Sequence, residues 1–204
     1  GNPPVVVDAT ADIKRAAGDI VKGVYYENCI LCIAEKEILV ENCVADELIR
    51  NMVKEGAYLA DDNEIQKICD TVMIETKDGK HAPNKKFVGR DASYILEESG
   101  IHTTKEAKII IADVPFEHPL VKTEMLMPVI PLTRTATVDE AIEKAVIAEN
   151  GCHHTAIMHS ENVNNLTKMG RAIDTTIFVK NAPSYAGLGI DGEGYTTLTI
   201  ATPT

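Results

Sequence analysis

The sequence lacks any run of apolar residues close to the roughly 18–20 that are needed to cross a bilayer. Its first residues, GNPPVVVDAT, also lack the basic segment and the long apolar segment of a secretory signal. Positive charge is scarce as well, because 20 basic residues face 31 acidic ones and leave a formal net charge of −11. A field of this sign repels nucleic acid and anionic lipid. We therefore expect no nucleic-acid partner and no membrane partner.

Cysteine is too sparse and too scattered to form a disulfide framework. The chain has five cysteines, an odd number, at positions 29, 32, 43, 69 and 152, which is typical of a protein from a reducing cytosol. With 204 residues, 45% of them hydrophobic, the chain is long enough for one or two compact domains. It has no initiator methionine and begins almost directly on a strand-like PVVVD, a start that is typical of an excised domain.

What the chain does contain is an alternation of helix-like and strand-like segments. Apolar residues recur with helical spacing at Ile13, Ala16, Ala17 and Ile20, and continuous apolar runs such as AKIIIADV are typical of buried parallel strands. We expect strands at 4–8, 37–40, 107–114, 125–135, 154–160 and 175–180, and helices at 9–26, 44–54, 62–73, 92–99, 138–150 and 162–173. The prolines in 125–135 favour a place near a sheet edge or in a channel wall. The order predicts an α/β fold with a largely parallel sheet flanked by helices.

Two cysteines three residues apart, Cys29 and Cys32, are the first candidates for chemistry. A structural zinc site needs four ligands, and the nearest others, at positions 152–154, are far along the chain. A redox pair would begin a helix after a strand, whereas this pair precedes the strand-like CIAEKEILV. A single nucleophilic thiol at Cys32, in a short connection before that strand, fits better. The spacing alone leaves two buried structural cysteines open as well.

Five segments together resemble one enzyme family. They are GNPPVVVDATADIKRAAGDIV, CIAEKEILV, TEMLMPVIPL, GCHHTAIMHS and NAPSYAGLGIDGEGYTTLTIA, and the resemblance runs from residue 1 to 204 in the family's order. In these segments the chain is similar to the CoA-acylating aldehyde dehydrogenases, above all to the acetaldehyde and propionaldehyde dehydrogenases of ethanolamine and propanediol utilisation in bacterial microcompartments. The resemblance implies an aldehyde dehydrogenase catalytic-domain fold, and it places the family's nucleophile on Cys32.

The resemblance also implies the reaction, which is oxidation of a short-chain aldehyde to an acyl-CoA with NAD and coenzyme A. A Cys32 thiolate would attack the aldehyde, its own N–H would stabilise the oxyanion, and loss of hydride would leave a thioester for coenzyme A to attack. Hydrolytic relatives carry a general-base Glu in a Glu-Leu-Gly-Gly stretch, where this chain has GNPP without an acid. Attack by water on the thioester is therefore disfavoured relative to attack by a thiol.

Two further residues match functional positions of the family. Glu124, in TEMLMPVIPL, falls on the Glu that binds the nicotinamide ribose, although residues 125–127 depart from the family's pattern. His154 is implied in deprotonating the thiol of coenzyme A or in lining its channel. Taken by themselves, Glu124 is also compatible with an ordinary surface carboxylate, and His154 with a structural histidine. No metal site is expected.

The resemblance assigns residues 1–204 to the nucleophile-bearing catalytic domain, without the family's NAD-binding domain, so the chain alone is expected to be inactive. It implies small-molecule partners, a homo-oligomeric parent and a place in the bacterial cytoplasm, in a microcompartment.

The basic segment 77–90 is expected to be a solvated loop, with contact to CoA phosphates as the alternative. The glycine-rich segment 184–198 is expected to be irregular and to shape the substrate tunnel. Two other functions stay open: a non-catalytic α/β structural or interaction domain with buried structural cysteines, and a cysteine acyl transferase that does not use NAD.

Overall fold

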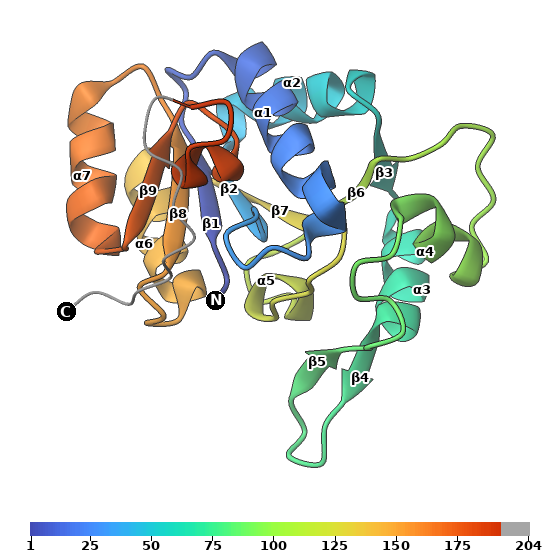
Figure 1. Cartoon of the computed structure of the whole chain (residues 1–204). Helices are drawn as coiled ribbons and strands as arrows, with labels where there is room; N and C mark the ends of the chain where they lie inside the picture. The colour runs from blue at the N-terminus through green and yellow to red at the C-terminus, as the bar shows by residue number, and fades with distance from the viewer. Residues whose placement is uncertain (193–204) are drawn as a thin grey trace.

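The computed structural model describes residues 1–192, so part of the glycine-rich segment lies outside the described residues. Seven strands form one sheet in the order β3-β6-β7-β2-β1-β8-β9, and each neighbouring pair is parallel (Figure 1). These strands are β1 (Pro4–Val7), β2 (Glu37–Glu41), β3 (Ala57–Ala60), β6 (Ile109–Asp113), β7 (Val129–Thr135), β8 (Thr155–His159) and β9 (Ile177–Lys180). The largely parallel α/β sheet predicted from the sequence is confirmed.

Helices connect most of the strands. They are α1 (Ile13–Tyr25), α2 (Asn42–Lys54), α3 (Asp62–Val72), α4 (Ala92–Glu98), α5 (Pro119–Lys122), α6 (Val138–Glu149) and α7 (Val163–Ile173). Two short 3-10 helices, η1 (Tyr26–Cys29) and η2 (Ser184–Leu188), follow α1 and β9. Within residues 1–192, none of the helices combines the length and the apolar character that a membrane crossing requires.

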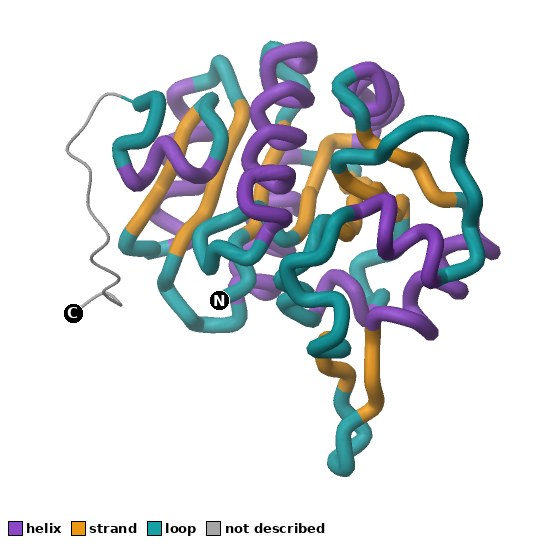
Figure 2. The backbone as a smooth tube through the Cα atoms, turned by 45° about the vertical axis from the view of Figure 1, so that its right-hand side comes forward, coloured by secondary structure: helices purple, strands orange, loops and turns teal. Residues whose placement is uncertain are grey.

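The sheet separates two hydrophobic cores. Because side chains alternate between the two faces of a strand, Val5 and Val7 of β1 pack into the core beneath α1 and α2, whereas Val6 packs into the core on the other face. Helices α3 to α7 contribute their buried side chains to that second core. Figures 1 and 2 show the resulting three layers, with the sheet between two sets of helices.

The helix starts follow from capping chemistry. α1 begins at Ile13 rather than at residue 9, because the side chain of Asp12 accepts a hydrogen bond from the backbone N–H of Arg15 at 3.0 Å. α3 begins after its N-cap Asp61, which forms a capping box with Glu64. Two four-residue elements, β3 and α5, were not predicted from the sequence.

Two sequence-based expectations need correction. β7 does not lie at a sheet edge, since it is paired with β6 on one side and with β2 on the other. Its Pro131 is tolerated because the registered pairing with β2 begins only at Leu132. The segment 77–90 is not entirely a loop, because β5 (His81–Pro83) pairs antiparallel with β4 (Met73–Glu75) and forms a hairpin that projects from the domain (Figure 1). The five basic side chains of this segment are exposed, as a solvated segment requires.

Candidate active site

The amino ends of the central strands gather the predicted site residues at one edge of the sheet. Glu124 precedes β7, Cys32 precedes β2, Gly1 precedes β1 and His154 directly precedes β8, and these four strands are neighbours in the sheet. Parallel strands start at the same edge of a sheet, so these four residues lie at that edge although up to 153 positions separate them in the sequence. Ligands of open α/β sheets usually bind at the carboxyl ends of the strands. The candidate site therefore lies at the opposite edge from the usual one.

Gly1 lies at the centre of this group. Its nitrogen donates a hydrogen bond to Oε2 of Glu124 at 3.1 Å. A methyl group placed on Gly1 would be 3.5 Å from Cγ of His154 and 3.8 Å from the backbone oxygen of Cys32. The structure thus brings Cys32, Glu124 and His154 around one backbone position.

Cys32 lies in a tight connection, residues 30–36, which we call the Cys32 loop. The chain enters it from η1 through three consecutive residues with positive φ, at Glu27, Asn28 and Cys29, and a turn closed by the bond from the N–H of Ala34 to the carbonyl of Leu31 (3.1 Å) carries Cys32. Positive φ is uncommon for side chains other than glycine. The backbone N–H of Cys32 donates to no group within residues 1–192, so it is available to an incoming oxyanion.

The Cys32 thiol is partly buried against an apolar cluster. Ile33, Tyr185 and Leu188 form this cluster, and Cys32 packs against it. Cys29 has a different environment: it is buried, its thiol donates to the carbonyl of Glu35 at 3.4 Å, and burial raises the pKa of that thiol. Since only the thiolate is nucleophilic, Cys29 is the less reactive of the two. All five cysteines are free thiols.

A buried lysine binds the backbone of the Cys32 loop and of Cys29 just before it. The Lys36 ammonium donates to the carbonyls of Cys29 and Leu31, both at 2.9 Å, and to the thiol of Cys29 at 3.3 Å. The side chain is almost fully buried, and a buried ammonium is stable only when its donors are used. Lys36 therefore fixes the two carbonyls that precede Cys32.

A buried carboxylate connects the same loop with η2. Glu35 is fully buried and accepts two hydrogen bonds from Ser184, one from its backbone N–H at 2.8 Å and one from its hydroxyl at 2.7 Å. Burial, opposed by these hydrogen bonds, raises the pKa of Glu35 to about 7. The carboxylate also lies against Gly23 of α1, where a methyl group would overlap it.

Glu37, the first residue of β2, is a second buried acid. It is fully buried, and neither carboxyl oxygen has a hydrogen-bond partner within the described residues. Burial, reinforced by the negative charges of Glu124 and Glu149, raises its pKa well above the usual range. The raised pKa favours the neutral form of Glu37, which avoids an unpaired buried charge.

His154 is held by its neighbours and leaves one ring nitrogen unused. Its backbone N–H donates to Oε1 of Glu149 at 3.1 Å, and Nδ1 lies 2.7 Å from the hydroxyl of Thr155. Nε2 is buried without a hydrogen-bond partner within the described residues. Burial and the nearby positive charge of the Gly1 nitrogen lower the pKa of His154, so the ring is neutral at neutral pH. Within residues 1–192, no three His, Cys, Asp or Glu side chains are grouped so as to hold a metal ion.

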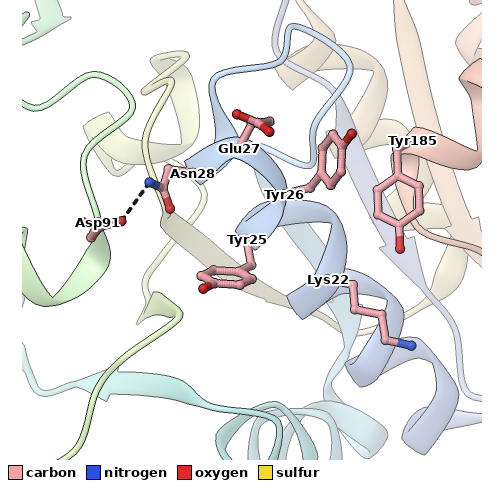
Figure 3. A pocket seen from close by; sticks show the side chains of 7 residues that line it. All are labelled: Lys22, Tyr25, Tyr26, Glu27, Asn28, Asp91 and Tyr185. Carbon is pink, nitrogen blue, oxygen red and sulfur yellow. Dashed lines mark hydrogen bonds between the residues drawn. The ribbon is translucent and has the colours of Figure 1, made fainter. Parts of the chain in front are cut away.

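A pocket of about 440 Å³ opens beside the carboxyl end of α1. Figure 3 shows Tyr26 and Tyr185 side by side in its lining, and their ring centroids lie 5.1 Å apart. The lining also includes Asn28 and Asp91, and the Asn28 amide donates to Asp91 at 2.9 Å (Figure 3). Tyr185 belongs both to this pocket and to the apolar cluster against which Cys32 packs.

Sequence reasoning missed the buried charges at 35–37 and their partner Ser184. Three consecutive charged residues normally indicate a solvated segment, and nothing local connects Glu35 with a serine 149 residues away. One signal was available. The following residues, ILV, do not alternate with polar ones, which is typical of a strand buried on both faces. This pattern favours burial of the charged residues at the start of the strand as well.

The three-layer α/β architecture, with Cys32 at the amino ends of its central strands, defines the class: an α/β domain with a candidate thiol site at one sheet edge. The model of the aldehyde dehydrogenase family matches residues 1–190. The chain therefore belongs to the aldehyde dehydrogenase family, and its resemblance to the CoA-acylating members is confirmed by its relatives.

An acetylating acetaldehyde dehydrogenase, EutE, from Salmonella typhimurium is 48% identical over the whole chain, which spans 44% of that protein. The structure of Rhodopseudomonas palustris propionaldehyde dehydrogenase with bound propionyl-CoA matches with a TM-score of 0.93 and 51% identity, over 100% of this chain and 44% of that one; another structure of that enzyme holds CoA and an acylated cysteine. A propionaldehyde dehydrogenase from the fucose-utilisation microcompartment of Clostridium phytofermentans matches with a TM-score of 0.91 and 44% identity, over 98% of this chain and 45% of that one. The chain thus spans less than half the length of these relatives.

Proposed function

We propose that this chain is the nucleophile-bearing part of an enzyme that oxidises acetaldehyde or propionaldehyde to the corresponding acyl-CoA. The observation that carries the proposal is the environment of Cys32, a partly exposed thiol whose backbone N–H has no partner within residues 1–192, gathered with His154 and Glu124 at one sheet edge. The acylated cysteine in the Rhodopseudomonas palustris structure supports the same role for Cys32.

In the proposed reaction the Cys32 thiolate attacks the aldehyde carbon, and the carbonyl oxygen becomes an oxyanion that the Cys32 N–H stabilises. The apolar cluster with Tyr185 receives the short alkyl group. Bound NAD⁺ supplies the acceptor for the hydride that leaves this carbon, and a thioester remains on Cys32. The thiolate of coenzyme A then attacks the thioester, a C–S bond to coenzyme A forms, and the Cys32 thiolate leaves.

His154 and Glu124 have separate roles in this proposal. The His154 ring, whose lowered pKa favours its neutral form, has an Nε2 without a hydrogen-bond partner in the described part of the chain, and in this proposal Nε2 accepts the proton of the coenzyme A thiol. Glu124 is partly exposed, with a side-chain exposure of 26%, and Gly1 uses only one of its oxygens. The other oxygen is free to accept from the ribose hydroxyls of NAD. These residues fit the cofactor that the resemblance implies.

The complete enzyme is proposed to use NAD with coenzyme A as co-substrate, to form a homo-oligomer, and to work in the bacterial cytoplasm, in a microcompartment such as the one that holds the Clostridium phytofermentans relative. Most contacts to NAD are proposed to come from a separate dinucleotide-binding domain. We therefore expect the 204-residue chain alone to form no NADH from an aldehyde.

The reaction run backwards tests the proposal on this chain. Propionyl-CoA is incubated with the chain at neutral pH, and acylation of each cysteine is followed by mass spectrometry. We expect Cys32 to be acylated ahead of the other four, with the exposed Cys43 as the matched control for a thiol without a site. Equal rates at Cys32 and Cys43 would contradict the proposed function.

A further inference from the structure

The Cys32 loop is attached to a distant part of the chain through one side chain. Both carboxylate oxygens of Glu35 are used by Ser184, one by its N–H and the other by its hydroxyl. Both residues are buried, so water does not compete for these bonds. We call this pair of bonds the Glu35–Ser184 clamp.

Each end of the clamp is close to one wall of the site. On one side Glu35 follows Cys32 by three residues in the same loop. On the other side Ser184 begins η2 and is followed directly by Tyr185, whose ring packs against Ile33 and lies 5.1 Å from that of Tyr26 (Figure 3). The clamp therefore fixes the distance between the thiol and the aromatic wall of the pocket.

The surroundings leave the carboxylate little freedom. Gly23 of α1 lies directly against it, and even a methyl group there would overlap it. Lys36 holds the other side of the loop through the carbonyls of Cys29 and Leu31. With both sides held, a change at Glu35 is transmitted to Cys32 and to Tyr185 together.

We propose that Glu35 is a positioning residue that sets the size of the acyl pocket by holding Tyr185 at a fixed distance from the Cys32 thiol. The inference rests on the proposed function, because it assigns Cys32 and Tyr185 to the acyl site. Glu35 touches neither substrate nor cofactor, and it acts through the two segments that it joins. Misplacing a reacting group by about 1 Å can slow a reaction about a hundredfold, so the clamp affects both rate and selectivity.

Glu35→Leu removes both bonds of the clamp, because the leucine side chain has no acceptor. Ser184→Ala keeps only the bond from the backbone N–H of residue 184. Asp8→Asn is the matched control. Asp8 is also fully buried and accepts from Thr10, Ser160 and Asn165, but it lies at the carboxyl end of β1, across the sheet from the site.

The test measures Cys32 acylation by acetyl-CoA and by butyryl-CoA, below the melting temperature of each variant, together with hydrogen exchange of residues 29–36 and 184–188. We expect Glu35→Leu and Ser184→Ala to slow acetylation of Cys32 about tenfold or more, to change the acetyl-to-butyryl rate ratio, and to speed exchange in both segments. The double variant should be no slower than the slower single variant, because both remove the same clamp. Asp8→Asn should stay within about twofold of the native rates and keep the native rate ratio.

A general loss of stability would slow both acyl donors equally and would not distinguish Asp8→Asn from the clamp variants. Native rates and an unchanged ratio in both clamp variants, or equal effects in Asp8→Asn, would overturn the inference. If the native chain shows no preference for Cys32, the proposed function fails, and the exchange data decide alone. Faster exchange in both segments then supports the clamp, whereas unchanged exchange refutes it. If Glu35→Leu does not fold, Ser184→Ala carries the same comparison.

Discussion

Replacing Gly23 of α1 by alanine should destabilise the protein, although alanine is the better helix former. A methyl group at Gly23 would overlap the carboxylate of Glu35, which is fully buried and bound twice by Ser184. The carboxylate must move and lose these bonds. At pH 8, above the pKa of Glu35, hydrogen bonds to this charged group contribute about 1.5–3 kcal/mol each, whereas glycine to alanine in a helix gains about 1 kcal/mol. The expected net loss is therefore about 2–5 kcal/mol in the free energy of unfolding.

The assay is urea unfolding followed by far-ultraviolet circular dichroism. Gly18→Ala in the same helix is the matched control, because no atom lies within 4 Å of a methyl group there; it should stabilise the protein by up to about 1 kcal/mol. Adding Glu35→Ala to Gly23→Ala removes the overlap, so the two losses should fall short of additivity by more than about 1 kcal/mol. If Gly23→Ala stabilised the protein as Gly18→Ala does, the close contact between α1 and Glu35 would be refuted.

Three further predictions concern titratable groups. Burial raises the pKa of Glu35 to about 7 from 4.5, so its contribution to stability is fully present below about pH 4.5 and is lost, by roughly 3 kcal/mol, as the pH rises toward 7. Glu35→Gln should remove this difference between the free energies of unfolding in urea at pH 5 and pH 8. The same difference in Glu35→Gln as in the native chain would show that Glu35 is not its source. Burial lowers the pKa of His159 to about 4 from 6.5, so its contribution to the free energy of unfolding is present above pH 6.5 and is lost, again by roughly 3 kcal/mol, as the pH falls to 4. His159→Phe should therefore weaken the fall in melting temperature between pH 6.5 and pH 4. A fall as steep as that of the native chain would exclude His159 as its source. His154→Ala should slow transfer of the acyl group from Cys32 to coenzyme A about a hundredfold. Mass spectrometry follows this transfer as loss of the thioester on Cys32 after coenzyme A is added. A native transfer rate in His154→Ala would exclude the histidine from the mechanism.

The sequence predicted those parts of the fold that depend on local pattern. Helical spacing located α1, and apolar runs located β6 and β8. The short edge strand β3 escaped because AYLA is only four residues long and exposes Leu59. The position of β7 inside the sheet was missed because Pro131 was weighed as an edge signal without knowledge of where pairing with β2 begins.

The candidate site was predictable only in part, for a related reason. Cys32, Glu124 and His154 came from the resemblance of short segments, and the structure gathers them around Gly1. Glu35 and Lys36 could not be recognised, because their burial is decided by partners such as Ser184 and by the backbone carbonyls of a loop with unusual φ angles. Local propensity contains no information about contacts of that range.

The contact between Glu35 and Ser184 joins positions that are 149 residues apart, which has a consequence for synthesis on the ribosome. The loop with Cys32 is synthesised well before its partner Ser184 in η2, and His154, directly before β8, also comes after the loop. Contacts of such long sequence separation form late and slowly. The Cys32 loop therefore lacks the contact with Ser184 until about 150 further residues have been synthesised.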